Sequence, residues 1–200
     1  MTTFLTFWAF EEFWHGEAIG RVLAAHEEPY GGMRVAAVRA RHRIRQTLAP
    51  LGAMITSSIT NNFTAVHMTW GSVNEWTTQA GYSRLIRRAD HPVLSELLER
   101  IMKQEGRHID FYSSEATRRL DGNRAAQNLT RFALNKFWAP VGSTIMPQTE
   151  VAHLSNYLFR DEGGRNMGAR IDRRIDRLPG LGGLDLIANS IDRYLNLSAA

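Results

Sequence analysis

Two copies of the pattern Glu-x-x-His constrain the fold of this 200-residue chain more than any other feature. The first runs from Glu12 to His15 and the second from Glu105 to His108. Residues three positions apart lie on one face of an α-helix, about one turn from each other. Each pair can therefore direct a carboxylate and an imidazole toward one point, if both segments are helical and pack together.

The hydrophobic pattern predicts helices along most of the chain. The expected helices cover 3–25, 33–48, 54–89, the segment from the residue after Asp90 to about 120 with Pro92 in its first turn, 124–138, 148–159, 165–177 and 184–196. We expect an interruption near 61–62, an N-cap from Asp90, and joints at the Gly-Gly pairs 163–164 and 182–183. No alternation typical of strands is apparent. The sequence predicts one all-α domain over 1–200, a helical bundle over about 3–140 with a C-terminal helical appendage over about 141–200.

Composition narrows the chemistry that this chain can perform. It contains no cysteine, which excludes disulfides, thiolate metal sites and cysteine nucleophiles. The start of the chain lacks a basic leader, and no apolar run is long enough to span a membrane, so we expect a cytoplasmic protein. The formal charge of +4 suits an acidic partner, but nucleic-acid binding is not expected because no known module is recognisable.

A third acidic residue, Glu75, lies between the two Glu-x-x-His motifs on a long predicted helix. Bundles that bind two metal ions combine Glu-x-x-His helices with helices that supply single Glu ligands. Carboxylates with imidazoles suit iron and leave positions open for dioxygen. We therefore predict Glu12, His15, Glu75, Glu105 and His108 as metal ligands. The alternative is surface glutamates beside ordinary core histidines. A further match, Glu150-Val-Ala-His153, is interpreted as a chance one.

Three segments resemble one family of helical metalloproteins. Phe-Glu-Glu-Phe-Trp-His-Gly-Glu at 10–17, Glu-Trp-Thr-Thr at 75–78 and Glu-Gly-Arg-His at 105–108 are similar to motifs of the soluble acyl-acyl-carrier-protein desaturases, which are ferritin-like di-iron proteins. The order and spacing of these motifs agree over roughly residues 4–120. The resemblance implies a ferritin-like bundle with additional C-terminal helices.

The same resemblance implies an activity and its partners. Two iron ions with dioxygen as co-substrate would introduce a cis double bond into a fatty acyl chain carried on acyl carrier protein. Electrons would come from a ferredoxin-type donor, and a homodimer is expected. By position, Thr78 would lie beside the oxygen site, although its hydroxyl can instead bond a carbonyl of its own helix. Alternatives are another di-iron oxidase, such as a hydroxylase or ferroxidase, and a truncated, catalytically silent relative that binds acyl chains or a partner.

Two departures from the family pattern affect the predicted site. The family has an earlier helix that supplies another Glu ligand, whereas only eleven residues precede Glu12 here. Glu11 and Glu17 are rotated by about 100° and about 140° from Glu12, so neither is a natural substitute. The family often has Asp, bonded to the first His, where this chain has Gln104. An amide can orient an imidazole but raises its basicity less.

Some features leave two interpretations open. Arginines line two helix faces, at Arg34, Arg41 and Arg45 and at Arg170, Arg173, Arg174 and Arg177. Each stripe can dock an acidic partner, or it can be a solvated face, the second stripe with local pairs to Asp172 and Asp176. Gly71, Ser72 and Gly81 either allow close helix approach or leave space for an acyl chain.

Overall fold

The computed structural model describes residues 2–28, 40, 62–143 and 145–197. Over these residues the chain forms helices and no strand, which confirms the all-α prediction. The seven helices of the described residues are α1 (Thr2–Ala25), α4 (Phe63–Ala89), α5 (Pro92–Leu120), α6 (Arg124–Phe137), α7 (Gln148–Phe159), α8 (Glu162–Asp176) and α9 (Leu186–Leu197). The predicted helix over 33–48, with its arginine stripe, and the first part of 54–89 lie outside the described residues.

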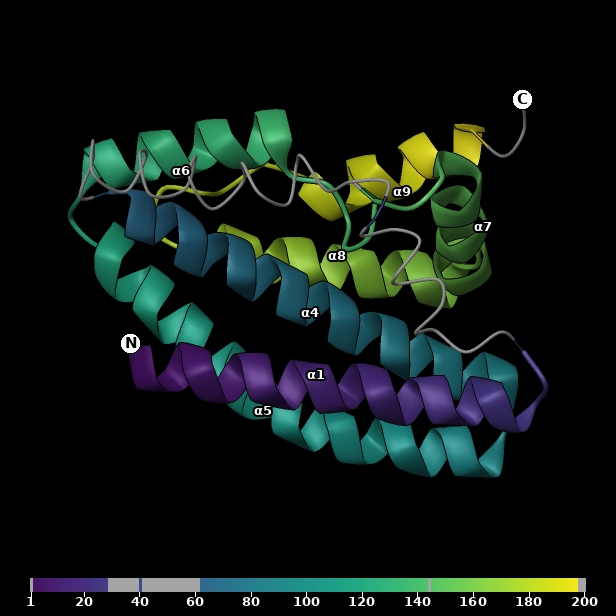
Figure 1. The fold of residues 1–200 in the computed structure, drawn as a ribbon. Coiled ribbons are helices and arrows are strands. Elements are labelled where there is room, and N and C mark those ends of the chain that lie inside the picture. The colour runs from purple at the N-terminus through teal and green to yellow at the C-terminus, as the bar shows by residue number, and fades with distance from the viewer. Residues whose placement is uncertain (1, 29–39, 41–61, 144, 198–200) are drawn as a thin grey trace.

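Helix α4 lies at the centre of the arrangement (Figure 1). Helix α5 packs along one side of α4, and α1 packs on α5, while α6, α7 and α8 contact α4 from other directions. Helix α9 is held by α7 and α8. None of the helices in the described ranges is sufficiently long and apolar to cross a membrane.

The core receives buried side chains from every helix between α4 and α9, and the contact between α4 and α5 is its most extensive part. Met68, Val73, Leu98 and Tyr112 are at most 2% exposed, and they hold the two long helices together. Gly71 allows this close approach, because a Cβ at that position would overlap the ring of Tyr112. One of the two interpretations of Gly71 is thereby confirmed: it permits helix contact.

The junction between α4 and α5 corrects one sequence prediction. Asp90 does not cap α5; it terminates α4 in the left-handed conformation, with φ of 46°. The N-cap of α5 is His91, whose Nδ1 accepts a hydrogen bond from the backbone N–H of Leu94 at 3.1 Å. Pro92 follows in the first turn, as predicted. An imidazole nitrogen can accept this bond as a carboxylate would, so composition alone does not distinguish the two caps.

The start of α8 is a second correction. The Gly-Gly pair at 163–164 is not a joint, because α8 begins at Glu162 and includes both residues. Asp161 caps the helix and accepts a hydrogen bond from the N–H of Gly164 at 2.8 Å. A Cβ on Gly164 would collide with the backbone of α7 at Phe159, so close packing explains this glycine. The pair at 182–183 does lie in a turn, where Gly183 has φ of 72°.

Candidate metal centre

Three helices bring acidic residues and histidines together inside the bundle. Glu12 comes from α1, Glu75 from α4, and Glu105 and His108 from α5. Each offers one ligand atom, and these four atoms lie within 4.8 Å of one another. Glu105 is 0% exposed and Glu75 is 6% exposed. Burying several carboxylates together is costly unless they are paired or bind a cation, so this group could hold a metal ion.

His15 joins the same group from α1. Its Nδ1 lies 3.2 Å from Glu105 Oε1 and 3.7 Å from Glu12 Oε1. The Nδ1 of His108 approaches the same two carboxylates, at 2.7 Å from Glu105 Oε2 and 3.5 Å from Glu12 Oε1. Both imidazoles therefore present the same ring nitrogen to one pair of carboxylates. The structure thus brings four of the five predicted ligands, Glu12, Glu75, Glu105 and His108, within reach of one ion, and it places His15 against Glu12 and Glu105.

The outer nitrogen of each imidazole has its own hydrogen-bond acceptor. His15 Nε2 donates to Gln104 Oε1 at 2.7 Å, which is the pairing expected for Gln104. His108 Nε2 donates to Glu11 Oε2 at 2.8 Å. Glu11 is held in turn by Arg107 at 2.6 Å. Histidines that bind metals usually donate their other N–H to such an acceptor, which fixes the ring and leaves the inner nitrogen available.

The residues alone did not reveal the part that Glu11 plays. Because Glu11 is rotated from Glu12 around α1, it is not one of the four residues whose ligand atoms lie close enough to share an ion. The same rotation turns it toward α5, where His108 Nε2 lies. No spacing rule within α1 could have indicated this contact, because it depends on how α1 and α5 pack.

Trp8 is a second residue whose contact with the cluster the sequence did not predict. Its indole N–H donates to Glu75 Oε1 at 2.8 Å and so joins α1 to α4. The indole also packs edge-on against Tyr112, with ring centroids 6.1 Å apart. Trp8 precedes Glu12 by four residues, the one signal in the sequence that it shares the metal-facing side of α1. It fixes the orientation of one Glu75 oxygen.

Three buried polar atoms of the cluster have no hydrogen-bond partner among the described residues: Glu12 Oε1, His15 Nδ1 and Glu105 Oε1. Leaving a buried polar atom unpaired costs about 1–3 kcal/mol. These atoms all point into the space that the carboxylates and the imidazole nitrogens share. A cation would satisfy all three, and oxygen with imidazole donors suits iron, so the residues present fit the metal that the family resemblance implies.

The electrostatics of the cluster are those of tightly paired opposite charges. Burial by itself lowers the pKa of His15, but Glu105 and Glu12 more than offset it and raise that pKa to about 10. The same neighbours raise the pKa of His108 to about 10, again against burial. Burial opposes ionisation of Glu105, yet hydrogen bonds from the two histidines lower its pKa. Burial, followed by the charge of Glu105, raises the pKa of Glu75. In the metal-free protein, protons on the imidazoles therefore balance the carboxylates.

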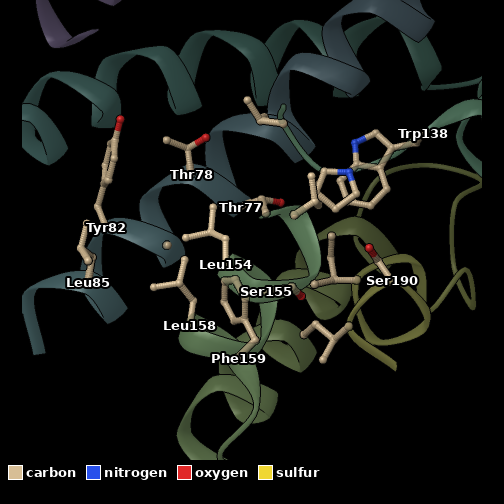
Figure 2. A pocket seen from close by; sticks show the side chains of 16 residues that line it. Thr77, Thr78, Tyr82, Leu85, Trp138, Leu154, Ser155, Leu158, Phe159 and Ser190 are labelled. Atoms are coloured by element: carbon tan, nitrogen blue, oxygen red, sulfur yellow. The ribbon is translucent and has the colours of Figure 1, made fainter. Parts of the chain in front are cut away.

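An apolar cavity of about 310 Å³ lies along α4, and Thr78 in its lining is one helical turn from Glu75 (Figure 2). Thr77, Thr78 and Gly81 of α4 form one wall, and Leu154 and Leu158 of α7 lie across from them. Trp138 and residues of α9 complete the lining. The hydroxyl of Thr77 bonds the carbonyl of Val73 at 2.7 Å, whereas that of Thr78 makes no such bond to a described residue. Thr78 therefore keeps a hydroxyl available one turn from Glu75, and Gly81 provides space in the cavity wall.

Tyr82 connects this cavity to the cluster. Its side chain lines the cavity at the edge beside Leu85 (Figure 2). Burial raises the pKa of the Tyr82 phenol, and the charges of Glu105, Glu12 and Glu75 raise it further. The phenol is thus close enough to all three carboxylates for their charges to raise its pKa. Thr78 and Tyr82 of α4 thus line the cavity within two turns of Glu75 of the candidate metal centre, an arrangement that the sequence pattern did not predict.

The third Glu-x-x-His motif takes no part in the cluster. Glu150 and His153 lie on α7, and His153 is exposed. Comparison with known proteins adds no family: no family model, no curated protein and no solved structure matches this chain. The function of this chain is therefore inferred from the geometry of the site.

Proposed function

We propose that this protein is a di-iron oxidase of the soluble acyl-acyl-carrier-protein desaturase type, built on a ferritin-like bundle. The observation that carries the proposal is the matched orientation of two imidazoles. His15 and His108 are each fixed at Nε2 by an acceptor, and each presents Nδ1 to the same buried carboxylates. Three of the surrounding polar atoms make ion-pair contacts with one another and no hydrogen bond among the described residues, and a cation between them would satisfy all three.

Glu12, His15, Glu75, Glu105 and His108 would together hold the two iron ions. Glu105 has one oxygen near each histidine, Oε1 at 3.2 Å from His15 Nδ1 and Oε2 at 2.7 Å from His108 Nδ1. Iron bound there would supply the reduction of dioxygen that an unactivated acyl chain requires for its oxidation. Overall, the two hydrogen atoms removed from the chain, two electrons from a donor and two protons from solvent would reduce one dioxygen to two waters.

The side chains around the ions have separate tasks in this proposal. Gln104 and Glu11 hold the two imidazoles in the tautomer that leaves Nδ1 available. Trp8 holds one oxygen of Glu75 by its N–H. Thr78 provides a hydroxyl between the metal centre and the cavity, where it can hold a water or pass a proton.

The apolar cavity is the proposed place of the acyl chain. Its volume of about 310 Å³ is in the range of small-molecule sites, and its lining is almost entirely apolar. The carbon to be oxidised would lie near Thr78 and Tyr82, at the edge of the cavity nearest the carboxylates. Acyl carrier protein as the carrier, a ferredoxin-type donor, a homodimer and a cytoplasmic location are parts of the same proposal.

Iron loading tests the proposal directly. The purified chain is loaded anaerobically with ferrous iron, desalted, and analysed for metal; we expect two irons per chain. His108→Asn should lose at least one of them, whereas His153→Asn, in the exposed third motif, should keep both. Retention of both irons by the first variant, or loss by both variants alike, would refute the assignment.

Activity separates the desaturase from its alternatives. Loaded protein is mixed with stearoyl-acyl carrier protein, dioxygen and a reducing system, and the fatty acids are analysed by mass spectrometry. A product two mass units lighter supports desaturation, and one sixteen units heavier indicates a hydroxylase. Iron oxidation without acyl product indicates a ferroxidase, and absence of stoichiometric iron indicates a catalytically silent relative.

A further inference from the structure

The arginine stripe on α8 makes no ion pair with any described residue. Its members are Arg170, Arg173, Arg174 and Arg177, and all four are exposed. The ion pairs of the described chain include other arginines, such as Arg165 of the same helix with Asp192 at 3.0 Å, but none of these four. Four guanidinium groups within two turns repel one another, so the stripe is an electrostatic cost that an acidic partner would relieve.

The two acidic residues within the stripe are already engaged elsewhere, which leaves Asp110 of α5 as the one carboxylate among the described residues that line the hollows beside it. Asp172 is buried and accepts hydrogen bonds from the backbone N–H groups of Ile187 and Ala188, both at 2.9 Å. Asp176 accepts one from the N–H of Gly183 at 2.8 Å. Both carboxylates therefore hold the segment that leads into α9. The four arginines are exposed, as a solvated face would be, but the expected local ion pairs with Asp172 and Asp176 do not occur among the described residues.

A groove runs alongside the stripe, between α8 and the two ligand-bearing helices α4 and α5. It consists of two adjoining hollows of about 480 and 180 Å³, and Trp76, Gln79 and Arg174 line both. Arg177 lines the first hollow and Arg170 the second. We call this the α8 groove. Because it is open and edged by arginines, it fits a protein surface that carries carboxylates better than an enclosed small molecule.

The floor of the α8 groove lies directly behind the metal ligands. Trp76, which follows Glu75 in the chain, is 5% exposed and has the guanidinium of Arg174 6.0 Å from its ring centre. Gly106, which follows Glu105, also lines the groove and has no side chain to fill it. A bound partner would thus be separated from the ligand carboxylates by little more than α4 and α5 themselves.

The α8 groove and the acyl cavity lie on different sides of α4. At 3.6 residues per turn, Thr78 and Gly81 of the cavity are about 200° and about 140° around the helix from Trp76 of the groove. A carrier protein that delivers its acyl chain into the cavity would therefore occupy another face. Two acidic partners could bind at once, one for the substrate and one for electrons.

We propose that the α8 groove is the docking surface for an acidic one-electron-donor protein. The inference rests on the proposed function, because only an oxidase of this kind needs external electrons. Such a donor would be oxidised by one electron in each encounter. Two encounters would supply the two electrons that, with two electrons and two protons from the acyl chain and two protons from solvent, reduce one dioxygen to two waters.

The test removes charge from the groove without touching the metal site. The variant Arg170→Gln/Arg177→Gln is compared with the control Arg165→Gln/Arg193→Gln, which removes the same charge from exposed positions away from the groove. Oxidised, iron-loaded protein is mixed anaerobically in a stopped-flow instrument with reduced plant-type ferredoxin. Reduced methyl viologen, a small cation that needs no arginine, provides the reference rate.

We expect the ferredoxin rate of the groove variant to fall at least about tenfold at low salt, with a weaker dependence on ionic strength. The control should change by less than about twofold, and the viologen rate of all proteins should be the same. Equal effects in both variants, or none in the groove variant, would overturn the proposal. So would a loss of affinity for acyl carrier protein in the groove variant while ferredoxin binding is unchanged.

Failure of the proposed function is recognised separately. If the chain takes up no iron, the oxidase assignment fails, yet ferredoxin affinity can still be measured by calorimetry on the metal-free protein. Arginine-dependent binding there would retain the docking surface. If iron loads and viologen reduces it, but ferredoxin reduction does not depend on Arg170 and Arg177, the docking surface alone is wrong.

Discussion

Proton release on metal binding is the prediction that follows most directly from the site. In the metal-free protein, His15 and His108 have pKa values of about 10, because buried carboxylates surround them. Binding through Nδ1 requires that each imidazole loses one proton. At pH 7 each of these pKa values lies about three units above the solution pH, so each deprotonation costs roughly 4 kcal/mol. Metal and protons therefore compete for the same atoms.

The magnitude of this competition is set by the number of protons. Loading both ions should release at least two protons per chain near pH 7, and a two-proton exchange changes the overall binding constant about a hundredfold per pH unit. Because the pKa values of the two histidines are raised, the affinity for metal should increase with pH until about pH 10, where the imidazoles lose their protons without metal.

The assay is calorimetric titration with cobalt(II), an air-stable substitute for ferrous iron, in two buffers that differ in ionisation enthalpy. The difference in apparent enthalpy counts the protons, and chelator competition between pH 6.5 and 8.5 gives the slope. His15→Asn should release about one proton fewer than the unmodified chain, and His153→Asn should release the same number. Stoichiometric binding with less than one proton released, or an affinity independent of pH, would refute the inferred charge state or the Nδ1 ligation.

Three further predictions concern stability. The metal-free protein should lose stability as pH rises from about 6.5 to about 10, because the site histidines have raised pKa values only when folded; an unfolding temperature that is flat over this range would contradict the pairing. Gly71→Ala should destabilise the protein by about 1–3 kcal/mol in urea unfolding, because its methyl group overlaps the ring of Tyr112. Arg84→Met should cost about 2–3 kcal/mol, since Arg84 Nε donates to the carbonyl of Leu158 at 2.8 Å and its guanidinium pairs with an aspartate. The more exposed Arg88→Met, which removes a second cation from that aspartate, should cost less than about 1 kcal/mol.

Several features of the fold could be predicted because they depend on neighbouring residues in the chain. The bounds of α7 agree with the predicted range, and α1 and α6 differ from it by one residue. Helical periodicity and breaker residues determine these limits locally. The prediction for Asp90 was wrong because two neighbouring residues could each cap α5. The prediction for the 163–164 glycines was wrong because a Gly-Gly pair can mark either a joint or a close contact between helices. There the packing of α8 against α7, or the availability of the His91 nitrogen, decided the outcome.

The candidate site divides in the same way. Helical spacing placed Glu12 with His15, and Glu105 with His108, on common faces, since an i, i+3 relation is a property of one helix. The contacts from Glu11 to His108 and from Trp8 to Glu75 each join two helices. Their lengths depend on the offset and rotation of α1 against its neighbours, which no single segment encodes.

The sequence by itself therefore determined the two Glu-x-x-His pairs and the helices that carry them, because both follow from periodicity along the chain. The tertiary structure alone decided which acceptors orient the imidazoles, where the apolar cavity lies, and that the α8 groove occupies the other side of α4. These are properties of surfaces that form only when helices pack, and their physical origin is the burial of side chains from segments far apart in the chain.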